Sequence, residues 1–520
     1  MDSSPPRRAA SALSLLLLAY MAVLLFVRLA DFPGLHGDEA WVGFFSMRLG
    51  ARGLYTPHEM NTYTGALYAW LVKDVFAWFG PGVWSLRLPG AVLNVAAWGL
   101  LWRVAAAAAG PWAGAAWCAL GASSAIVVLK SRVAWEVYAL QPLLLAAVLA
   151  SCRRLADGEG GGGAALTLFA ASLLGVQNHF IFLSIPIVLV VAGGVLYERG
   201  REERWLDFLQ LALVNMLPCL LLFFFKPMVS EASWPRLEVP LLAAFALLPA
   251  LALAASRTAP RWRPALAALF EHPRASAAAP WLERAFMALL FGFFWFHWVA
   301  LIEIQSGVVV LARLASMRLP WPAEALLYAW AAALLCGTLI DGFGRLRDGG
   351  RGLKPSAVLL AVLPPLYAAV FILFRNTSSI RYYALPSQLL LLAAAGALAR
   401  RPAFRRPAVL AGLCSGGLAL NALFWCAVLG REQRPPFRFR VGWHKEKSYD
   451  FIGKDDLFAA FEAGHLCKLV QEESMIDLPL LFRFTLSPAA GCDPSKAART
   501  QYCWDCSSPP YIKTTVVAAP

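Results

Sequence analysis

The chain has 520 residues, of which 59% are hydrophobic and only 15% are charged, and its formal net charge is +14. Soluble domains carry about 25% charged residues, so this composition excludes an ordinary water-soluble enzyme. The positive charge does not indicate a nucleic-acid partner, because the basic residues cluster between alternate apolar blocks. That distribution is the one that orients membrane proteins.

Apolar blocks of about twenty residues recur along the chain, and each is long enough to cross a hydrocarbon core of about 30 Å as a helix. We therefore predict an all-α, multi-pass membrane protein with thirteen spans. The spans are expected near residues 11–30, 84–104, 107–129, 137–152, 164–178, 180–197, 207–225, 239–256, 285–303, 323–343, 356–374, 382–399 and 408–429. The basic linkers then fall on one side, so we expect a cytosolic N-terminus and an outer C-terminus at the plasma (inner) membrane.

The loop after the first span, residues 31–83, holds the adjacent carboxylates Asp38 and Glu39. Its segments 40–55 and 64–80 are amphipathic and rich in aromatic residues. Such segments lie along the bilayer interface rather than across it. We expect a helical shelf on the outer leaflet with the two carboxylates at its leading edge. Two loop acids are as readily explained by simple solvation, so the other outer residues decide between the two interpretations.

Ionisable residues also stand at the outer ends of later spans. They are Lys130, Arg132 and Glu136 in the second outer loop, His179, Lys226 with Glu231, and Arg375 with Arg381 and Tyr382. Snorkelling of a long side chain to the interface explains any one of the cations. The set is less easily explained in this way. Together these residues indicate a site that binds an anionic lipid headgroup next to a general base.

Residues 431–520 differ from the rest because they contain no apolar block of spanning length. We expect a small soluble domain on the outer side, with residues 1–430 forming the membrane domain. The tail holds Cys467, Cys492, Cys503 and Cys506. An oxidising compartment favours two disulfides, while the C-x-x-C spacing of the last two keeps a zinc site open. The other six cysteines lie in apolar blocks, where they act as small hydrophobic residues.

Several motifs in fixed order resemble those of a known enzyme family. They are GDEAWVG after the first span, SLRLPGAVLNVAAWGLL in the second, SRVAWEVYALQPLLL at the fourth and SIRYYALPSQLLLLAAAGAL near the twelfth. Over residues 1–430 the chain is similar to the membrane glycosyltransferases of the GT-C fold, in particular the protein O-mannosyltransferases and the lipid A aminoarabinose transferase-like enzymes. The tail matches no family.

This resemblance implies transfer of a sugar, with inversion, from a polyprenyl-phosphate donor to a lipid, glycan or protein acceptor on the outer side. The family's first-loop acid falls on Asp38, with Glu39 as the second catalytic member. The resemblance also implies donor-phosphate or substrate contacts. These fall on Arg132, Glu136, His179, Arg381 and Tyr382, with Lys226 assigned by topology alone. A carboxylate can take the acceptor proton, and a guanidinium can hold the leaving phosphate. A divalent metal is possible through Glu39 or Glu136.

Three alternatives stay open at this point. A transporter of an anionic substrate would place its charges near the bilayer midplane and show repeated halves, whereas here the charges sit at outer helix ends and no repeat is visible. A ligase or polymerase would use glycans linked to polyprenyl diphosphate. A non-catalytic scaffold descended from such enzymes is the third. The sequence does not identify the sugar or the acceptor.

Overall fold

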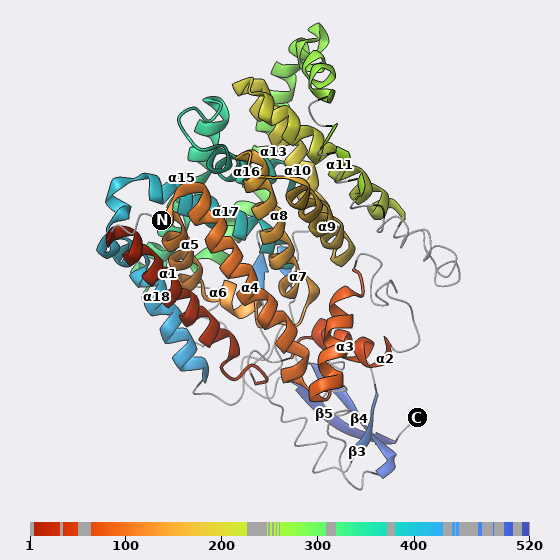
Figure 1. Cartoon of the computed structure of the whole chain (residues 1–520). Coiled ribbons are helices and arrows are strands. Elements are labelled where there is room, and N and C mark those ends of the chain that lie inside the picture. Colours follow the sequence, from red (N-terminus) through yellow and green to blue (C-terminus); the bar gives the residue numbers. More distant parts are fainter. Residues whose placement is uncertain are drawn as a thin grey trace.

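The computed structural model is a bundle of long helices with a few strands at one end (Figure 1). The structure describes residues 5–31, 35–49, 64–225, 261–307, 319–371 and 380–429, positions scattered between 247 and 258, and short pieces of the tail. The helices of the bundle and its outer loop follow in chain order. They are α1 (Pro5–Phe26), α2 (Gly37–Arg48), α3 (Leu67–Phe79), α4 (Val83–Ala109), α5 (Pro111–Ser123), α6 (Ala125–Lys130), α7 (Glu136–Ala139), α8 (Gln141–Ala156), α9 (Gly162–Asn178), η2 (Phe180–Leu183), α10 (Ser184–Gly200), α11 (Glu203–Phe225), α13 (Pro273–Ser306), α15 (Trp321–Arg347), α16 (Pro355–Phe371), η4 (Ile380–Tyr383), α17 (Ala384–Arg400), η5 (Pro402–Arg405) and α18 (Pro407–Leu429).

Every predicted span except 239–256 falls on these helices. The expected span 107–129 is divided at Ser124, where α5 ends and α6 begins. Within the described part of the chain, six helices are long and apolar enough to cross a membrane, and further apolar helices such as α16 and α17 are shorter. The mostly helical membrane architecture is confirmed, while the number of thirteen spans stays a prediction.

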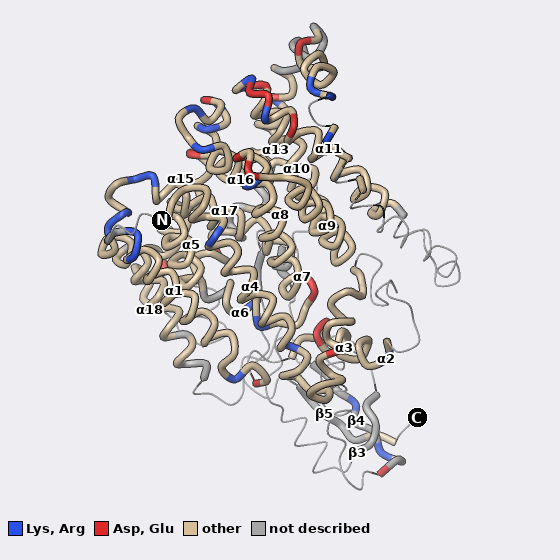
Figure 2. The backbone as a smooth tube through the Cα atoms, viewed as in Figure 1, with Lys and Arg blue, Asp and Glu red and all other residues tan. Residues whose placement is uncertain are grey.

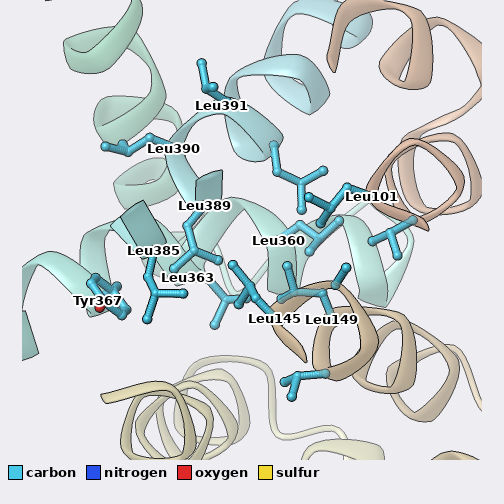
Figure 3. Packing of buried hydrophobic residues seen from close by; sticks show 14 of the residues in the cluster. Leu101, Leu145, Leu149, Leu360, Leu363, Tyr367, Leu385, Leu389, Leu390 and Leu391 are labelled. Atoms are coloured by element: carbon cyan, nitrogen blue, oxygen red, sulfur yellow. The ribbon is translucent and has the colours of Figure 1, made fainter. Parts of the chain in front are cut away.

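Helix α5 packs against four other helices, α1, α4, α17 and α18. Its residues 112–122 are all buried, and most of them are Ala or Gly. Small residues let helices approach closely, which is how membrane helices gain packing energy. At Gly114 a Cβ atom would lie 2.7 Å from the indole of Trp102 on α4, so the α4–α5 crossing requires a glycine there. Leucines fill the space between the other helices, with Leu101, Leu145, Leu360 and Leu389 meeting from α4, α8, α16 and α17 (Figure 3).

Contacts between basic linkers define one end of the bundle, which we name the basic face. Asp157, after α8, accepts hydrogen bonds from the backbone N–H and the hydroxyl of Ser356 at the start of α16 (3.0 and 2.8 Å). Lys354 donates to the carbonyl of Ala107 near the end of α4 (3.3 Å). Figure 2 shows Lys and Arg gathered around the ends of α15 and α18, away from α2 and α3. These linkers therefore share one end of the bundle, as the charge pattern predicts.

The opposite end carries α2 and α3, which we name the shelf (Figure 1). The two helices contact each other and have an apolar core of their own, in which Val42, Phe45, Tyr68 and Phe76 are buried. The shelf is therefore a packed layer on the bundle. Its described helices confirm the predicted helical character of the first outer loop.

The tail contains strands. A hairpin joins β1 (Phe439–Val441) and β2 (His444–Glu446), and a three-stranded sheet has the order β3 (Leu466–Val470), β4 (Asp493–Tyr502), β5 (Ile512–Ala518). Strands β3 and β4 are parallel, whereas β4 and β5 are antiparallel.

The tail also reaches the shelf. The buried ring of Phe482 packs edge-on against Phe44 with ring centroids 5.4 Å apart. Cys467 lies on β3, whereas Cys492, Cys503 and Cys506 fall outside the described residues, so the disulfide prediction stays untested.

Candidate active site

Helix α2 begins at the predicted carboxylates because the local sequence caps its N-terminus. Nδ1 of His36 accepts a hydrogen bond from the backbone N–H of Asp38 (2.9 Å), and Glu39 accepts one from the backbone N–H of His36 (3.0 Å). This reciprocal capping satisfies N–H groups that the first turn of a helix leaves unpaired. Two negative charges in the first turn also interact favourably with the helix dipole. The turn thus holds both carboxylates at the leading edge of the shelf.

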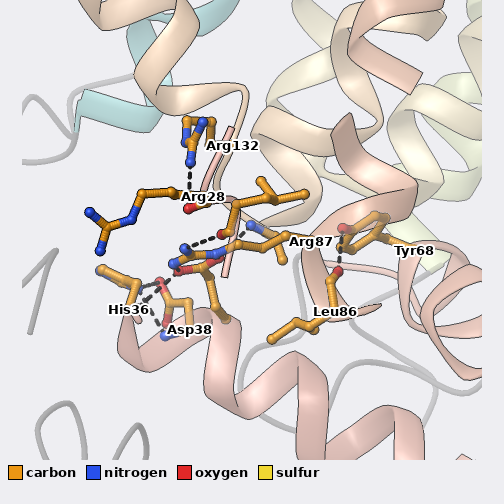
Figure 4. A network of polar contacts seen from close by, with 10 residues as sticks. Arg28, His36, Asp38, Tyr68, Leu86, Arg87 and Arg132 are labelled. Atoms are coloured by element: carbon orange, nitrogen blue, oxygen red, sulfur yellow. Dashed lines mark hydrogen bonds and ion pairs between the residues drawn. The ribbon is translucent and has the colours of Figure 1, made fainter. Parts of the chain in front are cut away.

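Glu39 is fully buried and anchors the shelf to the bundle. Its carboxylate accepts hydrogen bonds from Nε and Nη2 of Arg87 on α4 (2.9 and 2.8 Å) and from the backbone N–H of Ala134 (2.6 Å). Arg87 continues to the carbonyl of Leu29, just after α1 (3.0 Å). Figure 4 shows Arg87 at the centre of this network. The contacts therefore give Glu39 a positioning role, and its predicted role as a second catalytic carboxylate stays untested.

Asp38 lies beside this anchor and projects in another direction, since neighbouring residues of a helix are about 100° apart around its axis. The residue is 5% exposed, and its Oδ2 lies 3.7 Å from Nδ1 of His36 (Figure 4). The imidazole of His36 stacks on Trp135, with ring centroids 5.0 Å apart. Because Nδ1 accepts the N–H of Asp38, the proton of a neutral His36 ring lies on Nε2. The hydrogen bond to His36 and the stacking of His36 on Trp135 thus fix the backbone position of Asp38.

Arg132 is buried and caps the end of α1. Its Nη1 donates to the carbonyls of Leu24 and Leu25, and its Nη2 donates to those of Val27 and Arg28 (2.7 and 2.8 Å). The last carbonyls of a helix need such partners, and a cation there also complements the helix dipole. The described contacts of Arg132 therefore explain it as a structural residue. Its contact with a donor phosphate stays a prediction.

Glu136 begins α7 and is 3% exposed. Its backbone carbonyl accepts a hydrogen bond from Nδ2 of Asn178 at the end of α9 (3.0 Å). Nearby, the hydroxyl of Tyr68 donates to the carbonyl of Leu86 (3.1 Å). Burial raises the pKa of Tyr68, and the negative charges of Glu39 and Glu136 act in the same direction. Tyr68 of the shelf thus lies within electrostatic reach of both carboxylates and stays a neutral phenol.

His179 and Tyr382, predicted from distant parts of the sequence, lie together. Their ring centroids are 6.2 Å apart. Nδ1 of His179 accepts from the backbone N–H of Ile181 (3.2 Å), which fixes the ring at the start of η2. Thr64, three residues before the start of α3, forms a β-bridge with His179. The structure therefore brings the shelf to the junction of α9 and η2 and to the start of α17.

A cavity of about 50 Å³ opens between α6, α8 and α17. Its lining residues are Val127, Lys130, Ser131, Tyr138, Pro142, Ile304, Tyr383, Ala384, Ser387 and Gln388. Lys130 is only 6% exposed, and its Nζ lies 5.2 Å from the ring centroid of Tyr138. The cavity thus presents a cation, hydroxyl groups and an amide in apolar surroundings, which is the chemistry that binds an anion.

Two of the predicted residues are not described at the level of their side chains. The side chain of Arg381 and the whole of Lys226 lie outside the described part of the chain. For a divalent metal, the carboxylate of Glu39 is a poor ligand, because both of its oxygens already accept N–H groups. Among the described residues no group of three His, Cys, Asp or Glu could hold a metal ion.

Arg87 was not assigned to the site from the sequence, and Lys130 was counted among the cations of the site without a role of its own. Arg87 is a charged residue inside the apolar block 83–109, and such residues are functional or structural determinants in membrane proteins. Lys130 closes an apolar block in the same way. Their positions carried a signal, although the pairing of Arg87 with Glu39, 48 residues away, requires the fold.

Comparison with known proteins shows similarity at the level of structure. No protein-family model matches the sequence, and no curated protein matches it. The chain is similar to an oligosaccharyltransferase from Archaeoglobus fulgidus in complex with Zn and sulfate, with a TM-score of 0.51 and 13% identity over 87% of this chain and 55% of that chain.

Two further structures are similar. The archaeal oligosaccharyltransferase AglB from the same organism, in complex with an inhibitory peptide and a dolichol-phosphate, has a TM-score of 0.49 and 13% identity over 87% of this chain and 58% of that chain. ArnT from Cupriavidus metallidurans bound to undecaprenyl phosphate has a TM-score of 0.37 and 15% identity over 94% of this chain and 92% of that chain. ArnT, a lipid A aminoarabinose transferase, and AglB are both GT-C fold glycosyltransferases. The oligosaccharyltransferase with the TM-score of 0.51 has the fold that the sequence motifs of this chain resemble.

Proposed function

We propose that this protein is a glycosyltransferase that moves a sugar from a polyprenyl-phosphate donor to a lipid, glycan or protein acceptor at the extracytoplasmic face of the membrane. One observation carries the proposal. In the short segment 130–136, Lys130 lines the cavity and the backbone N–H of Ala134 donates to the carboxylate of Glu39, so this segment connects the cavity to the carboxylate turn of α2.

The chemistry follows from these groups. Asp38 takes the proton of the acceptor hydroxyl as its oxygen forms a bond to the anomeric carbon. The bond between that carbon and the phosphate oxygen breaks on the opposite side, and the phosphate leaves with the electron pair. This displacement inverts the anomeric centre. The leaving phosphate gains negative charge, which Lys130 in its apolar surroundings stabilises more strongly than water does.

The experiment is a transfer assay with the purified full chain in nanodiscs. Acceptors are the lipids, glycans and proteins of the envelope, and products are detected by mass spectrometry as a gain of one glycosyl unit. Three donors are compared, namely a sugar on polyprenyl monophosphate, a glycan on polyprenyl diphosphate and a nucleotide sugar. We expect transfer from the monophosphate alone. Transfer from the diphosphate alone would instead identify a glycan ligase, and transfer from none of the three would reject the proposal.

A further inference from the structure

A helix outside the predicted spans, residues 261–271, lies at the basic face, between the expected spans 239–256 and 285–303. One face of this helix contacts the bundle. Arg263 forms a two-pronged ion pair with Asp207 of α11 (both distances 2.6 Å) and contacts Glu203 (2.7 Å). Phe270 packs against Tyr197 of α10, with ring centroids 5.1 Å apart. The helix therefore lies where α10 ends and α11 begins.

One flank of this helix is apolar and exposed. Trp262 and Leu269, two turns apart and thus on the same side, are 57% and 64% exposed. Residues 263, 266, 267 and 270 face inwards, with Leu266 and Ala267 packed against the core. An apolar side at the rim of the bundle is unfavourable in water, whereas Trp is enriched where a membrane meets water. Its composition and its place at the ends of α10 and α11 both suit the headgroup region of the bilayer.

The charges around this side identify the lipid. Arg257 and Arg261 are exposed at the N-terminal end of the helix, and Glu271 is the one acid within residues 261–271. Arg201 and Arg204, on the neighbouring linker, already contact Glu198 and Glu202 (3.0 and 2.7 Å). Basic residues beside an apolar side at this depth attract lipids with negative headgroups, by about fivefold for each cation.

We propose that helix 261–271 is an interfacial helix that binds anionic phospholipids at the basic face of the membrane. The inference is independent of the proposed transfer reaction. Arg263, Asp207 and Glu203 hold the helix flat at the rim, Trp262 and Leu269 enter the acyl boundary, and Arg257 and Arg261 contact the phosphates.

Photo-crosslinking of the full chain in nanodiscs tests this inference. Benzoylphenylalanine replaces Trp262 or Leu269, with the inward-facing Leu266 as the matched control, in bilayers of equal phosphatidylglycerol and phosphatidylcholine. We expect lipid adducts from positions 262 and 269, with phosphatidylglycerol favoured, and crosslinks within the protein from position 266. The double variant Arg257→Gln/Arg261→Gln should lower the preference for phosphatidylglycerol by about fivefold or more. Arg201→Gln, next to Glu198, should leave it unchanged.

The outcomes are distinct. Adducts with both lipids in equal yield would overturn the assignment of an anionic partner. Crosslinks from positions 262 and 269 to a second protein molecule, or no lipid adducts from either, would overturn the interfacial helix. Thermal unfolding of each variant, compared with the unchanged protein, excludes loss of the fold as the cause.

Discussion

Glu39 and Arg87 form a bidentate ion pair in which neither side chain is exposed to solvent, with N–O distances of 2.9 and 2.8 Å. The pair joins the first turn of the shelf to the second predicted span. Since Asp38 is the neighbour of Glu39 on the same turn, the ion pair determines where the proposed base stands. A buried ion pair adds little net stability, but removal of one partner leaves an uncompensated charge.

We predict that Arg87→Met and Glu39→Gln each destabilise the protein and reduce transfer together. Breaking a buried pair costs about 3–5 kcal/mol, because the remaining charge has lost its partner. The double variant Arg87→Met/Glu39→Gln should regain part of the stability, as no buried charge then remains. Thermal unfolding in detergent measures the free-energy differences. Additive losses in the double variant would show that the two residues do not act as a pair.

The helical layout could be predicted because hydrophobic length and charge are local properties of the sequence. The blocks that became α4, α10 and α15 are long and mostly apolar, and the linkers between blocks carry arginines. The break at Ser124 and the strands of the tail were not predicted. Both depend on packing between segments that are distant in the sequence, where local propensity is overridden.

The disulfide prediction has a count that alkylation can measure. Six cysteines, all on helices of the bundle, are free thiols. If the remaining four of the ten, Cys467, Cys492, Cys503 and Cys506, form disulfides, the denatured unreduced protein takes six alkyl groups and the reduced protein takes ten. The exposed Cys336 and Cys426 serve as internal controls for complete reaction. Ten alkyl groups without reductant would contradict the prediction, and bound zinc would favour its rival.

Gly43 makes room for the tail on the shelf. A Cβ atom at this position would lie 2.3 Å from a ring carbon of Phe482, closer than carbon atoms approach without a shift. We predict that Gly43→Ala loosens the tail, so that limited proteolysis within residues 431–520 becomes faster. Phe482→Ala should do the same by removing the ring. Gly43→Ala added to Phe482→Ala should have no further effect, because the clash has gone, and an additional increase would show that Gly43 acts elsewhere.

The candidate site was only partly predictable. The turn of Asp38 and Glu39 was visible because two acids follow a spanning block, and Tyr382 and His179 stood at helix ends. The division of labour between the two acids was not visible, since it depends on Arg87 and Ala134. For Arg132 the structure adds a role that the sequence did not suggest, a cap on the carbonyls of α1, and its contact with a donor phosphate stays a prediction.

Lys130 should determine how well the donor is used. Loss of a charge-assisted hydrogen bond costs about 1.5–3 kcal/mol, so Lys130→Met should raise KM for the polyprenyl-phosphate sugar by roughly 10–150-fold. Ser387→Ala, on the same cavity, removes only a neutral hydroxyl and should have a smaller effect. Initial rates at varied donor concentration measure both. An unchanged KM in a folded Lys130→Met protein would show that Lys130 does not bind the donor phosphate.

Asp38→Asn, compared with Glu39→Gln, distinguishes the proposed role of Asp38 as a base from the positioning role of Glu39. The amide keeps the size of the side chain and the capping contact of its backbone N–H with His36, so stability should hardly change. Removal of a general base lowers the rate by about 10²–10⁴-fold. The expected result for Asp38→Asn is therefore a loss of turnover with an unchanged unfolding temperature. Glu39→Gln should instead lower both the turnover and the unfolding temperature. Rates with the polyprenyl-phosphate donor and unfolding curves of the same preparations provide the two measurements. Full transfer activity in a folded Asp38→Asn protein would remove Asp38 from the mechanism and leave Glu136 as the next carboxylate to test.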